Sequence, residues 1–321
     1  MTRVSADRAQ VRGEAGEFEA LVPRALAAAG GLVAGDWVAV DAERGAVERV
    51  LPRRTEFARQ AAGRRTERQV VAANVDVVFL LAGLDGDFRA RRLERYLALA
   101  HASGASPVVL LTKAGLCADA GAFVREAQAV ARGAPVHAID VVEGRGAEAP
   151  LGYLGPGVTA ALLGSSGVGK STLANHLLGE ARAETGAVRE HDARGRHTTT
   201  RRELFFLPSG AALLDTPGMR EVQLWVERSA LDETFDDLAA LAGGCRFRDC
   251  GHGAEPGCAL RAAVERGEVD AARLASFVAL GREIEGHAER RAERARRGRS
   301  EGRQAGRLVR EAMRMKYGRG G

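Results

Sequence analysis

The segment GSSGVGKST, residues 164–172, constrains the fold of this chain more than any other. It follows the apolar run VTAALL, precedes the helical pattern TLANHLLG and fits G-x-x-x-x-G-K-[ST]. In this motif glycines let backbone N–H groups face phosphate, and the following helix N-terminus adds favourable partial charge. Lys170 is expected to reach the β- and γ-phosphates as a catalytic residue, and Ser171 to bind Mg²⁺. The predicted nucleotide-binding residues here are Gly164, Ser165, Ser166, Gly167, Val168, Gly169, Lys170, Ser171 and Thr172.

The surrounding pattern predicts an α/β fold with three domains. Over residues 73–228, apolar strands alternate with amphipathic helices, which is typical of a parallel sheet covered on both faces. Residues 1–72 carry short alternating segments between Gly-rich turns, and this favours a small β-barrel or sheet. Residues 229–321 are expected to be helical, interrupted by a Cys/His cluster and ending in a basic tail.

Charge and lysine usage narrow the class of partner. Residues 281–321 carry 13 Arg/Lys against 6 Asp/Glu, typical either of a solvated helix or of a nucleic-acid-binding arm. Of 47 basic residues only Lys113, Lys170 and Lys316 are lysines, and two of them lie in TKAG and GKST. A compact ammonium beside phosphate or beneath a base is not replaced by a guanidinium. No signal peptide or apolar run of about 18 residues is visible, so we expect a cytoplasmic protein with no membrane partner.

Two segments after the phosphate loop suit a magnesium nucleotide. LLDTPG places Asp215 at the end of an apolar strand, where a carboxylate holds Mg²⁺ through water. In the same segment the backbone N–H of Gly218 is expected to meet the γ-phosphate. Between the phosphate loop and LLDTPG, the segment GRHTTTRRELF offers three threonines as Mg²⁺ ligands, of which we select Thr199.

The motifs occur in an unusual order. In most GTPases the base-reading loop N/T-K-x-D comes last, whereas here TKAG, residues 112–115, precedes the phosphate loop. Joining the original termini and reopening the chain after the DTPG region would give this order on the same sheet. With GSSGVGKSTLAN, GRHTTTRRELF, DTPGMRE and ERQVVAANVDVVFLL, the chain resembles the circularly permuted ribosome small subunit-dependent GTPase A family.

That resemblance covers nearly the whole chain and carries several expectations. It implies an N-terminal OB-fold, a circularly permuted phosphate-loop GTPase domain and a C-terminal zinc-binding domain. It implies that the protein binds GTP and GDP and acts in late maturation of the small ribosomal subunit through ribosomal RNA. We expect a monomer.

The base loop departs from the family pattern N-K-x-D. In the family pattern the aspartate accepts two hydrogen bonds from guanine. In this chain Gly115 stands at the position of that aspartate, and Thr112 stands at the position of the asparagine. Thr112, Lys113, Ala114 and Gly115 are still predicted to bind nucleotide. Our hypothesis is that Asp119 or Asp140 supplies the missing carboxylate.

The residue that positions the catalytic water is also altered. Met219 stands where a Ras-like GTPase has glutamine, and its side chain does not orient water. The resemblance makes His197 the candidate catalytic residue. It lies in GRHTTTRRELF, residues 195–205, which we call the switch segment. The alternative is that His197 is an ordinary loop residue.

A cysteine cluster indicates a metal site. CRFRDCGHGAEPGC gives C-x4-C-x-H-x5-C, and three thiolates with one imidazole suffice for a closed, structural zinc site. Disulfides are the rival interpretation, but three clustered cysteines leave one unpaired. Cys117 is interpreted as an ordinary apolar residue beside the base loop. The predicted zinc ligands are Cys245, Cys250, His252 and Cys258.

The leading functional prediction is therefore a Mg²⁺-dependent GTPase that acts on the small ribosomal subunit. Gly115 keeps open an NTPase of relaxed base specificity on the same scaffold. An RNA-binding module with little turnover is a third possibility, against which Lys170, Ser171 and Asp215 argue.

Overall fold

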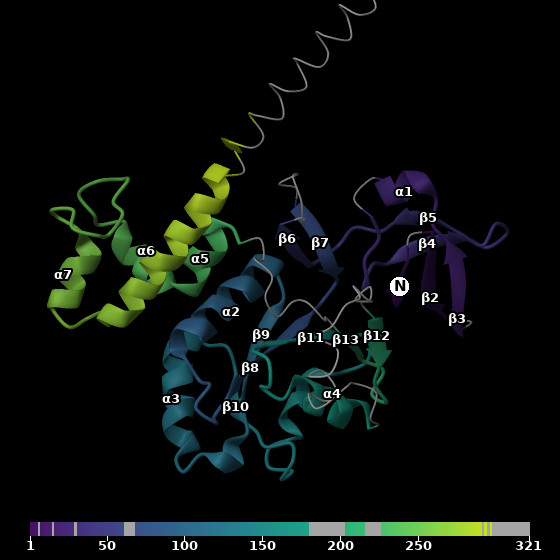
Figure 1. Cartoon of the computed structure of the whole chain (residues 1–321), viewed down its shortest axis with the longest axis horizontal. Coiled ribbons are helices and arrows are strands. Elements are labelled where there is room, and N and C mark those ends of the chain that lie inside the picture. The colour runs from purple at the N-terminus through teal and green to yellow at the C-terminus, as the bar shows by residue number, and fades with distance from the viewer. Residues whose placement is uncertain are drawn as a thin grey trace, which may run out of the picture.

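The computed structural model describes residues 1–5, 7–14, 16–28, 31–60, 68–179, 203–215, 226–290, 292–293 and 296. Its centre is a parallel sheet in the order β10-β9-β8-β11-β13, with β12 added antiparallel at one side (Figure 1). The apolar runs predicted as strands form this sheet. The strand bounds are β8 Val77–Gly83, β9 Ser106–Thr112, β10 Val136–Ala138, β11 Thr159–Gly164, β12 Glu203–Phe206 and β13 Ala212–Asp215.

Helices cover both faces of this sheet, as the pattern predicted. Alternate residues of β8 enter opposite cores, since Leu80 packs with Leu93 and Leu97 of one core and Phe79 with Leu173 of the other. The first core lies under α2 (Ala90–Ser103) and α3 (Ala120–Ala131), and the second lies under α4 (Lys170–Leu178). Two short 3₁₀ helices, η1 (Ala114–Leu116) and η2 (Ala149–Tyr153), follow β9 and β10.

The strand order matches the predicted circular permutation. If the chain is read from β11, the sheet order β12-β13-β11-β8-β9-β10 becomes 2-3-1-4-5-6. The strands that precede the phosphate loop in sequence therefore occupy the last three places. Permutation changes the loops that are cut, but it leaves strand neighbours and buried faces unchanged.

The N-terminal strands extend the same sheet. Strand β1 pairs with β12, so the 11-stranded sheet continues through β1-β2-β3-β5-β4. Val11, Ala20 and Val47 lie in a small separate core of this part. A hairpin of β6 (Glu56–Gln60) and β7 (Arg68–Ala73) leads into the central sheet. The remaining bounds are β1 Arg3–Val4, β2 Arg8–Gly13, β3 Gly16–Leu21, α1 Arg24–Ala28, β4 Val38–Asp41 and β5 Ala46–Val50.

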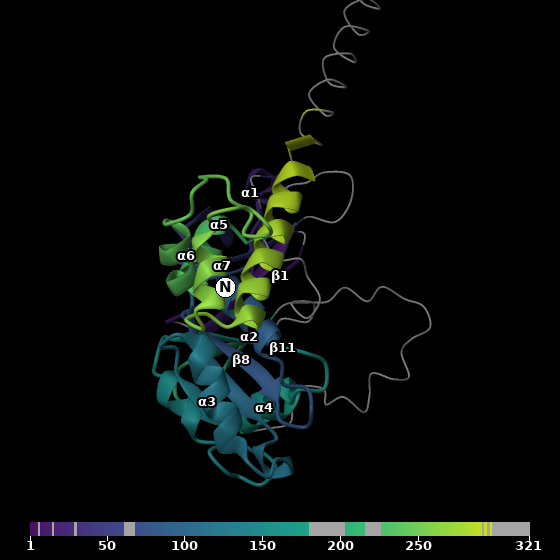
Figure 2. The same ribbon diagram turned by 90° about the vertical axis from the view of Figure 1, so that its left-hand side faces the viewer.

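The last part of the described chain is helical, as predicted. It comprises α5 (Arg228–Thr234), α6 (Asp236–Ala242), α7 (Ala259–Glu265) and a long helix over residues 271–290, drawn in yellow in Figures 1 and 2. Arg95 of α2 binds Glu283 of the long helix through two hydrogen bonds of 2.6 and 2.7 Å. Among the described helices, none combines the length and the apolar character that a membrane crossing requires.

Candidate functional site

The loops that carry the predicted nucleotide residues leave the carboxyl ends of neighbouring parallel strands. The phosphate loop follows β11, the TKAG segment follows β9, and further loops follow β8 and β10. In open α/β sheets this edge is where ligands bind, close to the point where the strand order reverses. The sheet therefore brings the phosphate loop and the TKAG loop to one edge, although about fifty residues separate them in sequence.

The phosphate loop has the geometry expected of its sequence. Gly169 adopts a left-handed φ of 99° immediately before α4 begins at Lys170, a conformation that glycine adopts without strain. The Lys170 ammonium donates to the carbonyl of Gly164 at 2.7 Å and also to that of Ser165. The lysine thus lies against the loop through which an anion would be held.

Two aspartates after β8 support this edge, and the sequence prediction missed both. The Ser165 hydroxyl donates to Asp87 Oδ2 at 2.5 Å, and the Lys113 ammonium binds Asp85. The hydrogen bond from Lys113 holds the pKa of Asp85 below its usual value, although burial opposes it. The signal available in the sequence was the acidic pair in LDGDF, directly after an apolar strand.

The TKAG loop is fastened to the phosphate loop. Thr112 is buried, and its hydroxyl donates to the carbonyl of Val168 at 2.7 Å. Lys113 adopts a left-handed φ of 58° immediately before η1 begins. Because Thr112 joins the two loops directly, a shift of one displaces the other.

The two aspartates proposed to replace the missing carboxylate are engaged with backbone. Asp140 accepts from the N–H groups of Gly115 at 2.9 Å, Val142 at 3.1 Å and Glu143 at 3.0 Å. The Glu143 N–H, followed by the other two, keeps the pKa of Asp140 below its usual value against the effect of burial. Asp119 caps α3 by accepting from the N–H of Ala122 at 3.0 Å. Asp140 therefore joins the loop after β10 to Gly115.

Several predicted residues fall outside the described part of the chain. These are His197, Thr199, Gly218 and Met219. Asp215 is the last residue of β13, which places its backbone at the same sheet edge as the phosphate loop.

The four predicted metal ligands come together. The ligand atoms of Cys245, Cys250, His252 and Cys258 all lie within 4.8 Å of one another. His252 Nδ1 is 3.6 Å from the sulfurs of both Cys245 and Cys258. Tetrahedral zinc, with bonds of about 2.3 Å to sulfur and 2.0 Å to nitrogen, sets such atoms about 3.5 Å apart, so the donor set fits.

The electrostatics of this cluster also favour a cation. The backbone N–H of His252 lowers the pKa of the Cys250 thiol, but burial and the neighbouring thiols together raise it to about 11. A positive ion held by the cluster would stabilise the thiolate forms and reverse this effect on the pKa. Cys258 belongs to the core that contains Phe235 and Phe277, so a metal ion held by this cluster would be coupled to the packing of these helices.

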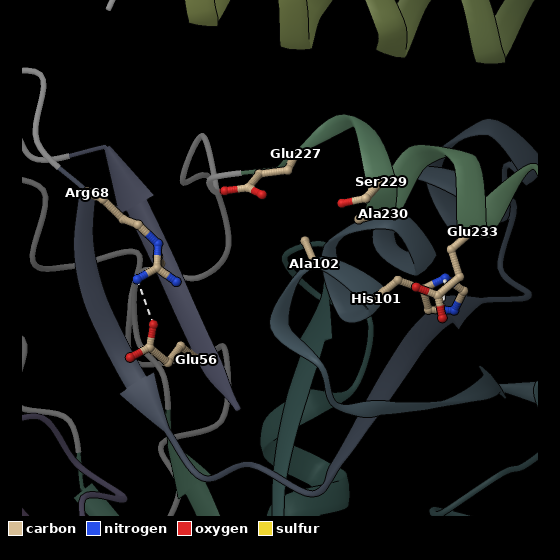
Figure 3. Close-up of a pocket in the computed structure, with 9 residues that line it drawn as sticks. Glu56, Arg68, His101, Ala102, Glu227, Ser229, Ala230 and Glu233 are labelled. Atoms are coloured by element: carbon tan, nitrogen blue, oxygen red, sulfur yellow. Dashed lines mark hydrogen bonds and ion pairs between the residues drawn. The ribbon is translucent and has the colours of Figure 1, made fainter. Parts of the chain in front are cut away.

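A separate polar pocket of about 120 Å³ lies between the β6–β7 hairpin and the ends of α2 and α5. In Figure 3, Arg68 pairs with Glu56 on the hairpin, and Glu227 and Glu233 project from the α5 side. Its lining residues include none of the phosphate loop or the TKAG loop. They are Glu56, Ala58, Arg68, His101, Ala102, Glu227, Ser229, Ala230 and Glu233.

The chain is similar to known proteins. The model of the RsgA GTPase family matches residues 50–225. A model of ABC transporters matches residues 152–305, a span that begins just before the phosphate loop.

The relatives of this chain include proteins named small ribosomal subunit biogenesis GTPase RsgA. The protein from Opitutus terrae is 52% identical over 262 residues, which are 78% of this chain and 71% of that protein. The protein from Xylella fastidiosa strain 9a5c is 52% identical over 263 residues, which are 80% of this chain and 75% of that protein.

Two solved structures are similar over most of the chain. YjeQ from Thermotoga maritima has a TM-score of 0.66 and 26% identity, covering 89% of this chain and 97% of that one. YloQ, a circularly permuted GTPase, has a TM-score of 0.60 and 23% identity over 88% of this chain and 92% of its own, and supports the fold alone.

Proposed function

The chain belongs to the RsgA GTPase family, and from this premise we propose that it hydrolyses GTP and assists biogenesis of the small ribosomal subunit. One structural observation carries the nucleotide part of this proposal. The TKAG loop is hydrogen-bonded to the phosphate loop through Thr112 at the carboxyl edge of a permuted sheet. We infer the small ribosomal subunit as the partner because the relatives are named as GTPases of small ribosomal subunit biogenesis.

Different residues at this edge contact the phosphates, the Mg²⁺ ion and the base of the nucleotide. Lys170 binds the β- and γ-phosphates, and backbone N–H groups of the phosphate loop and of Gly218 surround them. Ser171 and Thr199 would hold Mg²⁺, and Asp215 would contact the ion through a water molecule. The ion neutralises charge on the β- and γ-phosphate oxygens when it is bound. Thr112, Lys113, Ala114 and Gly115 form the wall on the base side.

Hydrolysis requires a positioned water. His197 is the residue proposed to orient it, because Met219 offers no hydrogen-bonding group. A histidine in the switch segment acts only when that segment is in place. We therefore expect slow turnover by the protein alone and faster turnover on the ribosomal subunit.

The other parts of the chain provide attachment. The cluster of Cys245, Cys250, His252 and Cys258 holds a structural zinc ion, which stabilises the helical domain. The N-terminal strands and the arginine-rich tail bind ribosomal RNA through its phosphates. The protein acts as a monomer in the cytoplasm, where small subunits are found, and not at a membrane.

The test compares hydrolysis of GTP, ATP and XTP with and without small ribosomal subunits. We expect a preference for GTP, stimulation by small but not large subunits, and loss of that stimulation as salt rises. Lys170→Ala is expected to lower turnover on the order of 100-fold or more. Arg125→Ala, on the exposed side of α3, is the matched control and should hydrolyse GTP normally.

Two results would count against this function. Equal use of the three nucleotides would favour the NTPase of relaxed specificity. Salt-sensitive binding to small subunits with no turnover of any nucleotide would favour an RNA-binding module.

A further inference from the structure

The space beside Gly115 is filled by a carboxylate from another loop. A Cβ atom added to Gly115 would lie 2.6 Å from Glu143 Oε2 and 2.7 Å from both its Cδ and its Oε1. Gly115 does not adopt a left-handed φ, so its backbone conformation does not require glycine. A side chain at position 115 would therefore have to displace the Glu143 carboxylate from its present place.

The Glu143 carboxylate lies directly beside the point from which a carboxylate on residue 115 would project. In an aspartate the carboxyl carbon is bonded to Cβ and is nearer to it than the two oxygens, whereas the Glu143 Cδ, at 2.7 Å, is no nearer to the added Cβ than its oxygens, so the carboxylate turns its face toward that Cβ. Both Glu143 oxygens approach the added Cβ to nearly equal distances of 2.6 and 2.7 Å. The same small volume at the sheet edge thus holds a carboxylate, although it is attached to a different strand's loop.

The loop that carries Glu143 is held firmly against the TKAG loop. Asp140 accepts from the N–H groups of Glu143 and Gly115, so a single side chain joins the two loops. The Asp140–Arg145 bridge closes the turn, and the Arg145 guanidinium pairs with Glu143 Oε2. Glu143 is thereby held in position on a tightened turn.

The position is open to a ligand. The Glu143 side chain is 44% exposed. Next to it Val142 is 87% exposed, and next to Gly115 Leu116 is 72% exposed. Two exposed apolar side chains beside a carboxylate offer a purine ring apolar surface as well as hydrogen-bond acceptors.

We propose that Glu143 determines guanine specificity in this chain by accepting hydrogen bonds from N1–H and the 2-amino group of the base. A carboxylate accepts both hydrogens side by side, and adenine presents no such pair of donors. The ion pair with Arg145 orients the carboxylate. The inference rests on the proposed function, since it assigns the base-reading residue of that same site.

The first experiment converts Glu143 to its amide. In Glu143→Gln the amide carbonyl still accepts from N1–H, but its NH₂ group faces the guanine amine. Xanthine carries an oxygen at that position, which accepts from NH₂. We expect GTP affinity to fall roughly 10- to 100-fold and XTP affinity to rise, as measured by calorimetric titration. Glu126→Gln, on the exposed side of α3, is the matched control and should bind both nucleotides as the parent does.

A second variant moves the carboxylate back to the TKAG loop. Glu143→Ala should lose the preference for GTP over XTP and ATP, and Glu143→Ala with Gly115→Asp should regain it. Gly115→Asp alone sets two carboxylates in one volume and should weaken GTP binding. If Glu143→Gln binds no nucleotide, the comparison of Glu143→Ala with the double variant decides the question. A preference for GTP that returns in the double variant supports the role of Glu143, and a preference that does not return overturns it.

The outcomes separate this inference from the function on which it rests. An unchanged ratio of GTP to XTP affinity in Glu143→Gln, with subunit-stimulated GTP hydrolysis intact, would overturn the role of Glu143 and leave the function standing. A parent protein that binds GTP no better than XTP and ATP would overturn both.

Discussion

At the scale of single residues, the site depends on a few side chains that join loops. Thr112 is 4% exposed, and its hydroxyl satisfies the carbonyl of Val168 at 2.7 Å. A buried carbonyl that loses its donor bears the cost of desolvation without compensation. The threonine hydroxyl makes the contact between the two loops.

Replacing Thr112 tests that contact. Thr112→Val keeps the shape of the side chain but removes the donor, so we expect the free energy of unfolding to fall by about 1–3 kcal/mol. GTP affinity should fall as well, because the TKAG loop loses its attachment to the phosphate loop. Urea unfolding and nucleotide titration measure the two effects. Thr112→Ser retains the hydroxyl, and a loss as large as that of Thr112→Val would contradict the assignment.

At the scale of elements, the long helix over residues 271–290 is held to α2 by buried charge. Arg273 donates to Glu94 Oε1 at 3.0 Å, and their side chains are 11% and 3% exposed. Arg273 also binds Asp237 of α6 at 3.0 Å. Removing one partner of such a pair leaves an uncompensated buried charge, whereas removing both costs less than the two single changes together.

A double-mutant cycle tests this connection. Arg273→Met is expected to lower the free energy of unfolding by about 3–5 kcal/mol. Glu94→Leu alone should also destabilise, and the double variant should lose less than the sum of the two. Strict additivity in chemical denaturation would show that the two charges do not interact. Arg266→Met is the control: it removes an exposed ion pair with Glu268 and should change the free energy of unfolding little.

At the scale of the whole molecule, separate hydrophobic cores stabilise different parts of the described chain. Two cores on opposite faces stabilise the central sheet, and the N-terminal strands continue that sheet through the β1–β12 pairing. The small core of the helical end includes Cys258 and packs with two further cysteines. A small core of this kind commonly needs a metal ion to fold stably.

Metal removal tests this dependence. We expect one zinc ion per chain by atomic absorption, and a marked loss of it in Cys258→Ser. A strong chelator should increase hydrogen exchange in α5, α6 and α7, because metal binding contributes to their folding. The central sheet should keep its protection and its GTP binding. Cys117→Ser is the matched control, and equal zinc loss in that variant would contradict the assigned ligand set.

The features that short segments encode could be predicted from the sequence alone. The phosphate loop, the alternation of strand and helix and the Cys/His spacing are local patterns, and each fixes backbone geometry or ligand chemistry within a few residues. The order of motifs along the chain also predicted the permuted strand order. The structure confirms the parallel sheet with its helices and brings the four cluster residues together.

The contacts on the base side of the site could not be predicted from the sequence. Asp119 and Asp140 were the sequence candidates for the missing carboxylate, yet both accept from backbone N–H groups, and Glu143 fills the space beside Gly115. Sequence patterns report the period and chemistry of one segment, whereas this arrangement arises between loops of different strands. Which side chain crosses from one loop to the next depends on strand register and turn geometry, and these are set by packing of the whole sheet.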